Sequence, residues 1–235
     1  MPESFLQQVA FDLREIDEII QIVHSFKATP DPASLERLRY LPRGNEMPDA
    51  DSDSRTRDFQ YELLIRAILR DGGLKATMSE PDVRVRFGKH QLAIEAKRPR
   101  NEARFDDRLR KAVIQLRKCR FKGVVAISMD HVLRPRGKIL SGPSQDLMVV
   151  QLSNLLVRFV EDHGREIQRR VADSNLVALI FTARMPSMVT TTGQLPILTA
   201  VHRLRRSSRP SLAALCQSYH QGFARWGVRA HLTGG

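Results

Sequence analysis

The sequence predicts an α/β fold in which a mixed central sheet is flanked by helices, with a helical appendage at the N-terminus. Residues 82–87 and 92–97 alternate apolar and polar side chains, which is typical of paired strands. Residues 123–129 form a continuous apolar run, which indicates a buried strand. Residues 58–70 and 102–120 instead repeat their apolar side chains at helical spacing. Helices interleaved with strands define this fold class.

Length and composition indicate one large domain with additions. The chain has 235 residues, 42% of them hydrophobic, which is enough for a substantial core. Cys119 and Cys216 lie far apart in helical patterns, so neither a disulfide framework nor a zinc site is indicated. Without an eighteen-residue apolar run or a leader-like N-terminus, we expect a cytoplasmic protein that does not contact membranes. We divide the chain into an N-terminal helical appendage (1–40), a polar acidic linker (41–57), the α/β domain with a sheet extension (58–204), and a basic connector with a C-terminal helix (205–235).

The first element is an amphipathic helix over residues 4–27. Its apolar residues follow alternating three- and four-residue steps, the pattern of a coiled-coil seam or a helix pair: Leu6, Val9, Leu13, Ile16, Ile20 and Val23. Further apolar residues widen this stripe, so we expect it to pack against the protein's own body. A homodimer or a contact with a partner protein is the alternative. Prolines at 30 and 32 end the helix, and Ser34 is the expected cap of the next one.

The two alternating strands carry the candidate chemistry. Residues two apart on a strand share a face, so Glu95 and Lys97 project together while Leu92, Ile94 and Ala96 take the other side. A hairpin through residues 88–90 brings Asp82 beside them. Two converging carboxylates suit Mg²⁺, and an adjacent lysine can orient or deprotonate a metal-bound water. Apolar neighbours on both faces imply that these charges are buried, where they persist only when paired or metal-bound. The pattern outlines a site for phosphodiester hydrolysis.

Pro81-Asp82 and Glu95-Ala96-Lys97 together resemble the signature of the PD-(D/E)xK nucleases, which have the restriction-endonuclease-like fold. The resemblance covers residues 57–130. It implies cleavage of nucleic acid, DNA more than RNA, by an endonuclease more than an exonuclease. It also implies that Asp82, Glu95 and the Ala96 carbonyl hold Mg²⁺ or Mn²⁺ and that Lys97 positions the attacking water. A role in restriction, defence or repair would follow from the family alone.

The flanking helices supply the remaining residues that the resemblance implies. Glu62, from residues 58–70, is expected to complete the metal shell, with Asp58 one turn earlier as its rival. Gln115, from residues 102–120, is expected to support the site. Cys119 stands where the Gln-x-x-x-Tyr branch of the family has tyrosine, so the chain departs from that branch.

The charge distribution favours a nucleic-acid partner. The chain has 38 Lys and Arg against 26 Asp and Glu, for a net charge of +12. Residues 1–62 have a net charge of −6, so the basic excess lies in the part that carries the motif. We expect five side chains around the helix over residues 102–120 to contact phosphates: Arg98, Arg100, Arg104, Arg108 and Lys111. A solvated helix face is the alternative meaning of these charges. A non-catalytic binding or assembly subunit is the alternative function.

The rest of the chain extends the sheet. Residues 131–143 are expected to form a basic loop, and Ser144 to cap a helix that ends near residue 161. Two further strands are expected at residues 175–182 and 195–204. A loop rich in Thr and Met (185–194) joins them, and a final helix, residues 212–226, contains Trp226.

Overall fold

The computed structural model describes most of the chain. It covers residues 3–26, 31–43, 55–87, 90–133, 139–172, 174–205, 215, 217, 221–222 and 230–233. Several predictions concern positions outside this set: the linker over 44–54, the hairpin turn at 88–89, the basic loop over 134–138, Cys216, Trp226 and most of the C-terminal helix.

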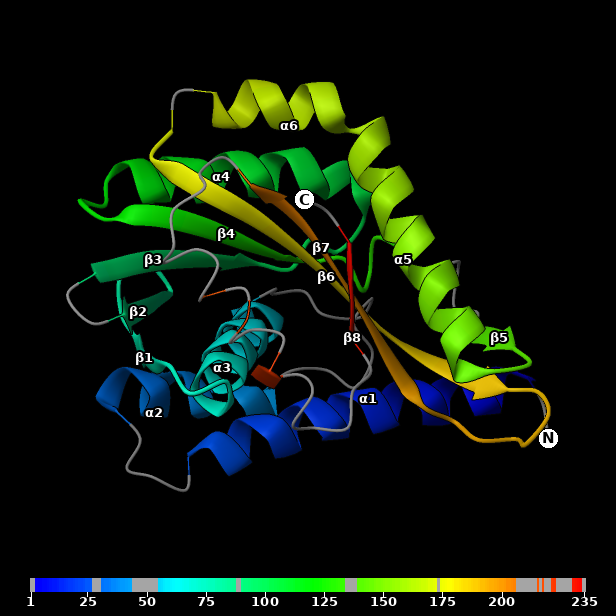
Figure 1. Cartoon of the computed structure of the whole chain (residues 1–235). Coiled ribbons are helices and arrows are strands. Elements are labelled where there is room, and N and C mark those ends of the chain that lie inside the picture. The colour runs from blue at the N-terminus through cyan, green and yellow to red at the C-terminus, as the bar shows by residue number, and fades with distance from the viewer. Residues whose placement is uncertain are drawn as a thin grey trace.

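Helices and strands alternate along the described chain (Figure 1). The first half contains α1 (Glu3–Ser25), α2 (Pro32–Leu38), η1 (Leu41–Arg43), α3 (Arg55–Asp71), β1 (Lys75–Met78), β2 (Val83–Phe87), β3 (His90–Lys97), η3 (Glu102–Arg104) and α4 (Phe105–Arg117). The second half contains β4 (Lys122–Ser128), β5 (Leu140–Gly142), α5 (Gln145–Asp162), α6 (Gly164–Val171), β6 (Leu176–Val189), β7 (Ile197–Arg205) and β8 (Ala230–Thr233).

Within the described residues, eight strands form one mixed sheet in the order β1-β2-β3-β4-β6-β7-β8, with β5 paired to one end of β6. The β1–β2, β2–β3 and β6–β7 pairs are antiparallel, whereas β3–β4 and β4–β6 are parallel. The parallel pairs need crossovers, and α4 supplies the one between β3 and β4. The expected α/β class with a mixed sheet flanked by helices is confirmed.

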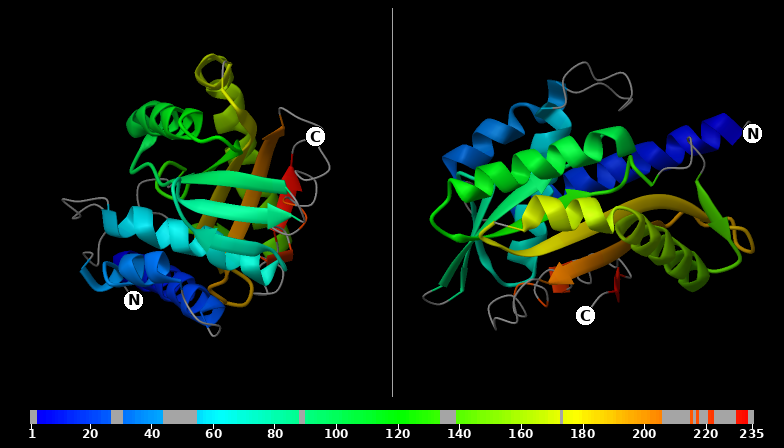
Figure 2. Two further views of the ribbon diagram at one scale, coloured as in Figure 1. Left: turned by 90° about the vertical axis from the view of Figure 1, so that its left-hand side faces the viewer. Right: turned by 90° about the horizontal axis from the view of Figure 1, so that it is seen from above.

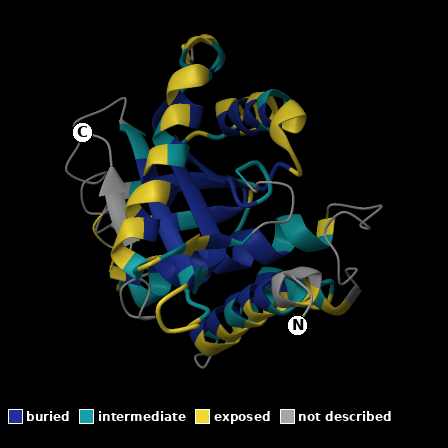
Figure 3. Cartoon of the chain, turned by 90° about the vertical axis from the view of Figure 1, so that its right-hand side faces the viewer, coloured by how far each residue is buried: buried dark blue, intermediate teal, exposed yellow. Residues whose placement is uncertain are grey.

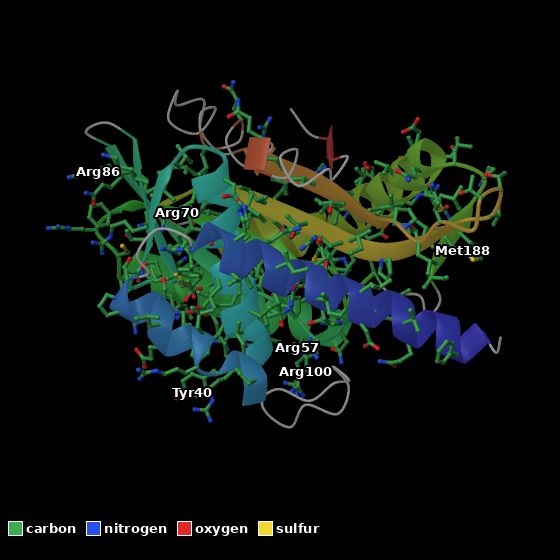
Figure 4. All side chains as sticks on the ribbon, turned by 90° about the horizontal axis from the view of Figure 1, so that it is seen from below. Tyr40, Arg57, Arg70, Arg86, Arg100 and Met188 are labelled. Carbon is green, nitrogen blue, oxygen red and sulfur yellow. The ribbon has the colours of Figure 1, made fainter. Side chains whose placement is uncertain are left out.

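Two helical layers cover the sheet (Figure 2). One core cluster joins α3 and Ile22 of α1 to the inward side chains of β1, β2 and β3. Figure 4, seen from below, shows α1 and α2 together with α3 on this side. The other cluster joins α4, α5 and α6 to the opposite face of β4 and β6. The motif strands β2 and β3 therefore lie between α3 and α4.

Several element boundaries differ from the expectations. Ser144 caps α5 as predicted, its hydroxyl accepting from Leu147 N at 3.4 Å. Asp31, not Ser34, caps α2, and its carboxylate accepts from Ser34 N at 2.9 Å. The expected helix over residues 102–120 is a 3₁₀ turn followed by the shorter α4. The expected loop over residues 185–194 is wrong in its first half, because β6 continues to Val189 while pairing with β7 and β5.

Helix α1 contacts the body mainly through the side opposite its predicted seam. Leu13, Ile16, Ile20 and Val23 of the seam are exposed, as the yellow outer face in Figure 3 illustrates. The buried side carries apolar residues such as Phe11 and Ile22 beside two buried charged residues, Arg14 and Glu18. Arg14 pairs with Asp130, and Glu18 pairs with Arg98 and Arg184. The expected packing of this helix against the protein's own body is confirmed, through added apolar residues such as Ile22, whereas most of the predicted seam faces outward. None of the helices over the described residues is both long and apolar enough to span a membrane.

Candidate active site

The β2–β3 hairpin brings Asp82, Glu95 and Lys97 together, as the alternation predicts. Val83 pairs with Ile94, so Asp82 lies level with the end of β3. The amide of Ala96 donates to Asp82 Oδ2 at 2.7 Å, which fixes the carboxylate against the neighbouring strand. Leu92, Ile94 and Ala96 lie in the core cluster that contains α3, on the face opposite Glu95 and Lys97.

Lys97 links the two carboxylates. Its Nζ lies 3.5 Å from Asp82 Oδ2 and also pairs with Glu95 Oε1. The Glu95 side chain is fully buried. Its second oxygen, Oε2, has no hydrogen-bond partner among the described residues. A buried carboxylate oxygen without a donor is costly, so this oxygen marks a position that a cation or proton would stabilise.

Helix α3 supplies the third carboxylate, and the structure distinguishes the two candidates on it. Glu62 is buried and accepts from Arg37 Nε of α2 at 2.5 Å. Asp58 instead pairs with Arg108 of α4 at 3.4 Å. Glu62 also interacts electrostatically with Asp82 and Lys97, which shows that it faces the motif residues. The geometry therefore favours Glu62 over Asp58 as the residue that faces the site.

The three acids of the site do not all ionise readily. Burial raises the pKa of Glu62 to about 8, and Asp82 adds to the effect, while Arg37 and Lys97 oppose it. Burial and Asp82 likewise raise the pKa of Glu95 to about 8 against the opposing effect of Lys97. For Lys97, burial lowers the pKa, but the three carboxylates outweigh it and the pKa is raised. Among the described residues, three acids share two cations, Arg37 and Lys97, so Glu62 and Glu95 retain protons that a bound cation would displace.

The donor set fits a hard divalent cation. It consists of carboxylate oxygens without a surrounding Cys or His shell, the chemistry that Mg²⁺ and Mn²⁺ prefer. The described residues contain no group of three His, Cys, Asp or Glu already spaced to hold one metal ion. The ion pairs give the reason: Lys97 Nζ lies between Asp82 and Glu95, and Arg37 engages Glu62. A bound metal would take over contacts that these two side chains now make.

Other predicted site residues lie apart from this cluster. Gln115 is exposed on α4 and lines a cavity with Pro81, without joining the carboxylates. The prediction that Arg98 contacts nucleic acid is wrong. Its guanidinium is buried and bonds Glu18 at 2.9 Å and Asp130 at 3.3 Å, so it does not reach the surface. Arg100, Arg104 and Lys111 are exposed, and Arg108 is partly covered.

Arg37 is the site residue that the sequence did not reveal. It comes from α2, 25 residues before Glu62, and its guanidinium also lies over the Phe59 ring at 5.5 Å. No motif or periodicity marks a lone arginine in a short helix as a partner of a distant glutamate. Only the packing of α2 against α3 places it there.

Comparison of the chain with protein-family models, with curated proteins and with solved structures gives no match. The residues of the site and their chemistry are therefore what a functional conclusion must rest on.

Proposed function

We propose that this chain is a metal-dependent nuclease that hydrolyses phosphodiester bonds of nucleic acid by endonucleolytic cleavage. We propose DNA rather than RNA as its substrate. One observation carries the proposal. Asp82, Glu95 and Lys97 converge in a buried cluster of ionisable side chains, and Glu62 of α3 belongs to the same cluster. The carboxylates outnumber their cations, and Glu95 keeps one oxygen free of donors among the described residues. Raised pKa values in a cluster of this composition are characteristic of functional sites.

The resemblance to the PD-(D/E)xK nucleases supports the same function and extends it to a restriction-endonuclease-like fold. The resemblance calls for a helix before the motif and a helix and strand after it. Helix α3 precedes β2 and β3, and α4 and β4 follow them. These elements place Glu62 beside the two motif strands.

In this proposal the carboxylates would bind the metal ion and the lysine would act on the attacking water. Asp82, Glu95 and Glu62 would hold Mg²⁺ or Mn²⁺, with the Ala96 carbonyl as a further oxygen donor. Such an ion, when bound, lowers the pKa of a water and offsets charge that develops on the phosphoryl oxygens. The Ala96 amide holds Asp82 in place through its 2.7 Å hydrogen bond. Lys97 Nζ would orient the attacking water and stabilise the developing charge.

A cleavage assay tests the proposal directly. Purified protein is incubated with plasmid DNA, linear DNA and RNA in the presence of Mg²⁺, Mn²⁺ or EDTA. We expect cleavage that EDTA abolishes and that Glu95→Gln and Asp82→Ala each reduce by about 10³-fold or more, because each removes a ligand for the ion. Asp162→Asn, which removes an exposed carboxylate at the end of α5, is the matched control and should cleave like the unchanged protein.

Two outcomes would overturn the assignment. One is a folded Glu95→Gln protein that cleaves at the unchanged rate. The other is a failure of the unchanged protein to cleave any of the substrates with either metal, which would favour a non-catalytic binding or assembly subunit.

A further inference from the structure

A second feature of the same face of the sheet is a basic cavity of about 420 Å³. It lies between the segment that precedes Asp82 and the turn that joins α4 to β4. Three cations line it, Arg84, Lys118 and Arg120, against one carboxylate, Glu80. The volume is within the range of small-molecule sites in proteins, roughly 300–1,000 Å³. The charge points to an anionic ligand.

Among the described residues, these three cations lack the carboxylate partners that basic side chains on α4 have. Arg108, Arg110 and Lys111 each pair with a carboxylate. By contrast, Arg84 reaches only the Glu80 carbonyl, at 3.3 Å, and its Nε is buried without a hydrogen-bond partner among the described residues. Within the part of the chain that the structure describes, Lys118 and Arg120 have no ion-pair partner. A buried guanidinium N–H without an acceptor is what an oxyanion would satisfy.

The aromatic ring of Phe121 holds two of these cations in place. The guanidinium of Arg84 lies 5.0 Å from the ring centroid and that of Arg120 lies 4.9 Å from it. Cation–π contacts of this kind orient a guanidinium while leaving its edge N–H groups free to donate. Two guanidinium groups around one ring therefore form a paired donor site that suits a phosphate.

The turn that carries Phe121 is itself fixed. The side-chain amide of Asn175 donates to the carbonyls of Leu116, Cys119 and Phe121 at 3.0, 3.1 and 2.8 Å. Leu116 packs so closely over Gly123 that a Cβ there would lie 2.7 Å from it. The wall of the cavity is thus ordered before any ligand binds, which lowers the entropic cost of binding.

The register of the sheet relates the cavity to the carboxylate cluster. Arg84 is two residues after Asp82, and it pairs with Ala93, which is two residues before Glu95. All four side chains project from the same face, because Ala93 lies in the core cluster on the α4 side. One strand step of two residues spans roughly 6–7 Å. A group bound in the cavity would therefore neighbour a group bound at the carboxylates.

We propose that this cavity binds a backbone phosphate of the nucleic-acid strand, next to the phosphodiester held at the carboxylates. This assignment rests on the proposed nuclease function for the source of the phosphate. Arg84 and Arg120 make the charge-assisted hydrogen bonds, and Lys118 adds charge at the rim. A phosphate contact of this kind positions the strand without reading its sequence.

The test uses binding without cleavage. A fluorescein-labelled DNA duplex is titrated with the full chain in EDTA, and anisotropy is followed over a range of salt concentrations. The double variant Arg84→Gln and Arg120→Gln should bind about 10-fold or more weakly. Its log–log salt slope should fall by about 0.9, because the protein no longer neutralises the one phosphate that the cavity holds. Inorganic phosphate should compete better than chloride of equal ionic strength with the unchanged protein, but not with the variant.

Two further variants keep the test specific. Arg165→Gln removes an exposed arginine from α6 and should leave affinity within about 2-fold and the slope close to its original value. Phe121→Leu keeps every charge but removes the ring under both guanidinium groups, so it should weaken binding by an intermediate factor. In steady-state cleavage the double variant should raise KM while kcat changes less than about 3-fold, because the carboxylate cluster is untouched.

The outcomes separate this inference from the proposed activity. A double variant with unchanged affinity and salt slope overturns the cavity assignment even if the protein cleaves DNA. DNA binding that depends on Arg84 and Arg120 supports it even if no metal yields cleavage, which would instead overturn the nuclease proposal. If phosphate binding is lost in the variant but DNA binding is not, the cavity takes a free anion and the backbone assignment is wrong.

Discussion

Two clusters of buried charged side chains lie near each other in this molecule, and they differ in the ratio of acidic to basic side chains. The carboxylate cluster around Glu95 has three acids against two cations among the described residues. The second cluster, under α1, is a continuous network of arginines and carboxylates that links α1 and α3 to the residues just after β3 and β4 and to the interior of β6. Its members are Arg14, Arg57, Arg98 and Arg184 with Glu15, Asp17, Glu18 and Asp130.

The pKa values of the two clusters move in opposite directions. Burial alone would raise the pKa of Asp130, but Arg98 and Arg14 outweigh it and the pKa is lowered. The pKa of Glu15 is also lowered, because Arg14, Arg98 and Arg57 outweigh its burial. At Glu62 and Glu95 burial and neighbouring acids prevail, and the pKa is raised. A balanced network fixes α1 to the body, whereas an unbalanced one leaves room for a cation.

The largest difference between the clusters should appear in the free energy of unfolding when one residue of each cluster is replaced. Arg98→Met would leave Glu18 and Asp130 as buried carboxylates short of a partner, so we expect a loss of about 3–5 kcal/mol in the free energy of unfolding. Glu95→Gln replaces an acid whose neutral form is already favoured, so near pH 7 we expect a change below about 1 kcal/mol. Urea denaturation measures both. Equal losses in the two variants would contradict the distinction.

The next largest effect should separate two residues within the carboxylate cluster. Lys97→Met should lower kcat by about 10²–10³-fold, because it removes the group that orients the attacking water. Glu62→Gln should instead raise the metal concentration for half-maximal activity by about 10–100-fold, with a smaller change in kcat. Metal titrations of cleavage rate measure both quantities. Asp58→Asn is the matched control on α3, and a metal requirement that shifts in it and not in Glu62→Gln would show that the wrong carboxylate was chosen.

The two clusters also differ in how far the sequence revealed them. The sequence predicts that Asp82, Glu95 and Lys97 converge because a strand alternates its faces every second residue. Glu62 follows only from the resemblance, which leaves Asp58 as a rival on the same helix. Arg98 continues the same basic segment, which predicts a surface cation. Its burial depends on Glu18, which lies 80 residues away and on the side of α1 that periodicity did not select.

The misjudged elements have local causes. The end of β6 escapes prediction because the stretch over residues 185–194, rich in Thr and Met, resembles a loop, and the proline within it, Pro186, is of a type disfavoured within a sheet. In α1 the apolar periodicity predicts the seam as the buried side, because such periodicity is the usual sign of a core-facing helix. The ion-pair network instead makes the other side of α1 the buried one. No local sequence pattern predicts this network, because its partners come from β3, β4 and β6 and the residues that follow them.

The pH dependence of stability should follow from the unbalanced cluster. The pKa of Glu62 and of Glu95 is about 8 in the folded protein, above the ordinary value of 4.5. The folded state therefore keeps protons that the unfolded state releases, and this stabilisation is complete below about pH 4.5 and lost as pH rises through 8. In EDTA we expect the free energy of unfolding to fall over that window, by at most about 1.4 kcal/mol per pH unit for each proton.

Thermal unfolding from pH 5 to 9 checks this expectation. Glu95→Gln should flatten the decline, whereas Asp162→Asn should leave it unchanged. Added Mg²⁺ should restore stability most at the alkaline end, because metal and protons compete for the same oxygens. A decline that is as steep in Glu95→Gln as in the unchanged protein would place the titrating groups elsewhere.

The smallest effect concerns cations that belong to neither cluster. Arg104 and Lys111 are exposed near and on α4, and Lys111 pairs only with the partly exposed Asp107 at 2.8 Å. If they contact phosphates, changing both to Gln should weaken binding to unrelated DNA duplexes by similar factors of about 3–10 and lower the salt slope by about 0.9 for each residue changed.

Arg108 is left in place because it holds Asp58. The buried apolar residues of α4, Phe105 and Leu109, are also untouched, so the unfolding midpoint should hold. An unchanged affinity and slope in this stable variant would make these charges a solvated face, and phosphate binding would then depend on the cavity at Arg84 and Arg120.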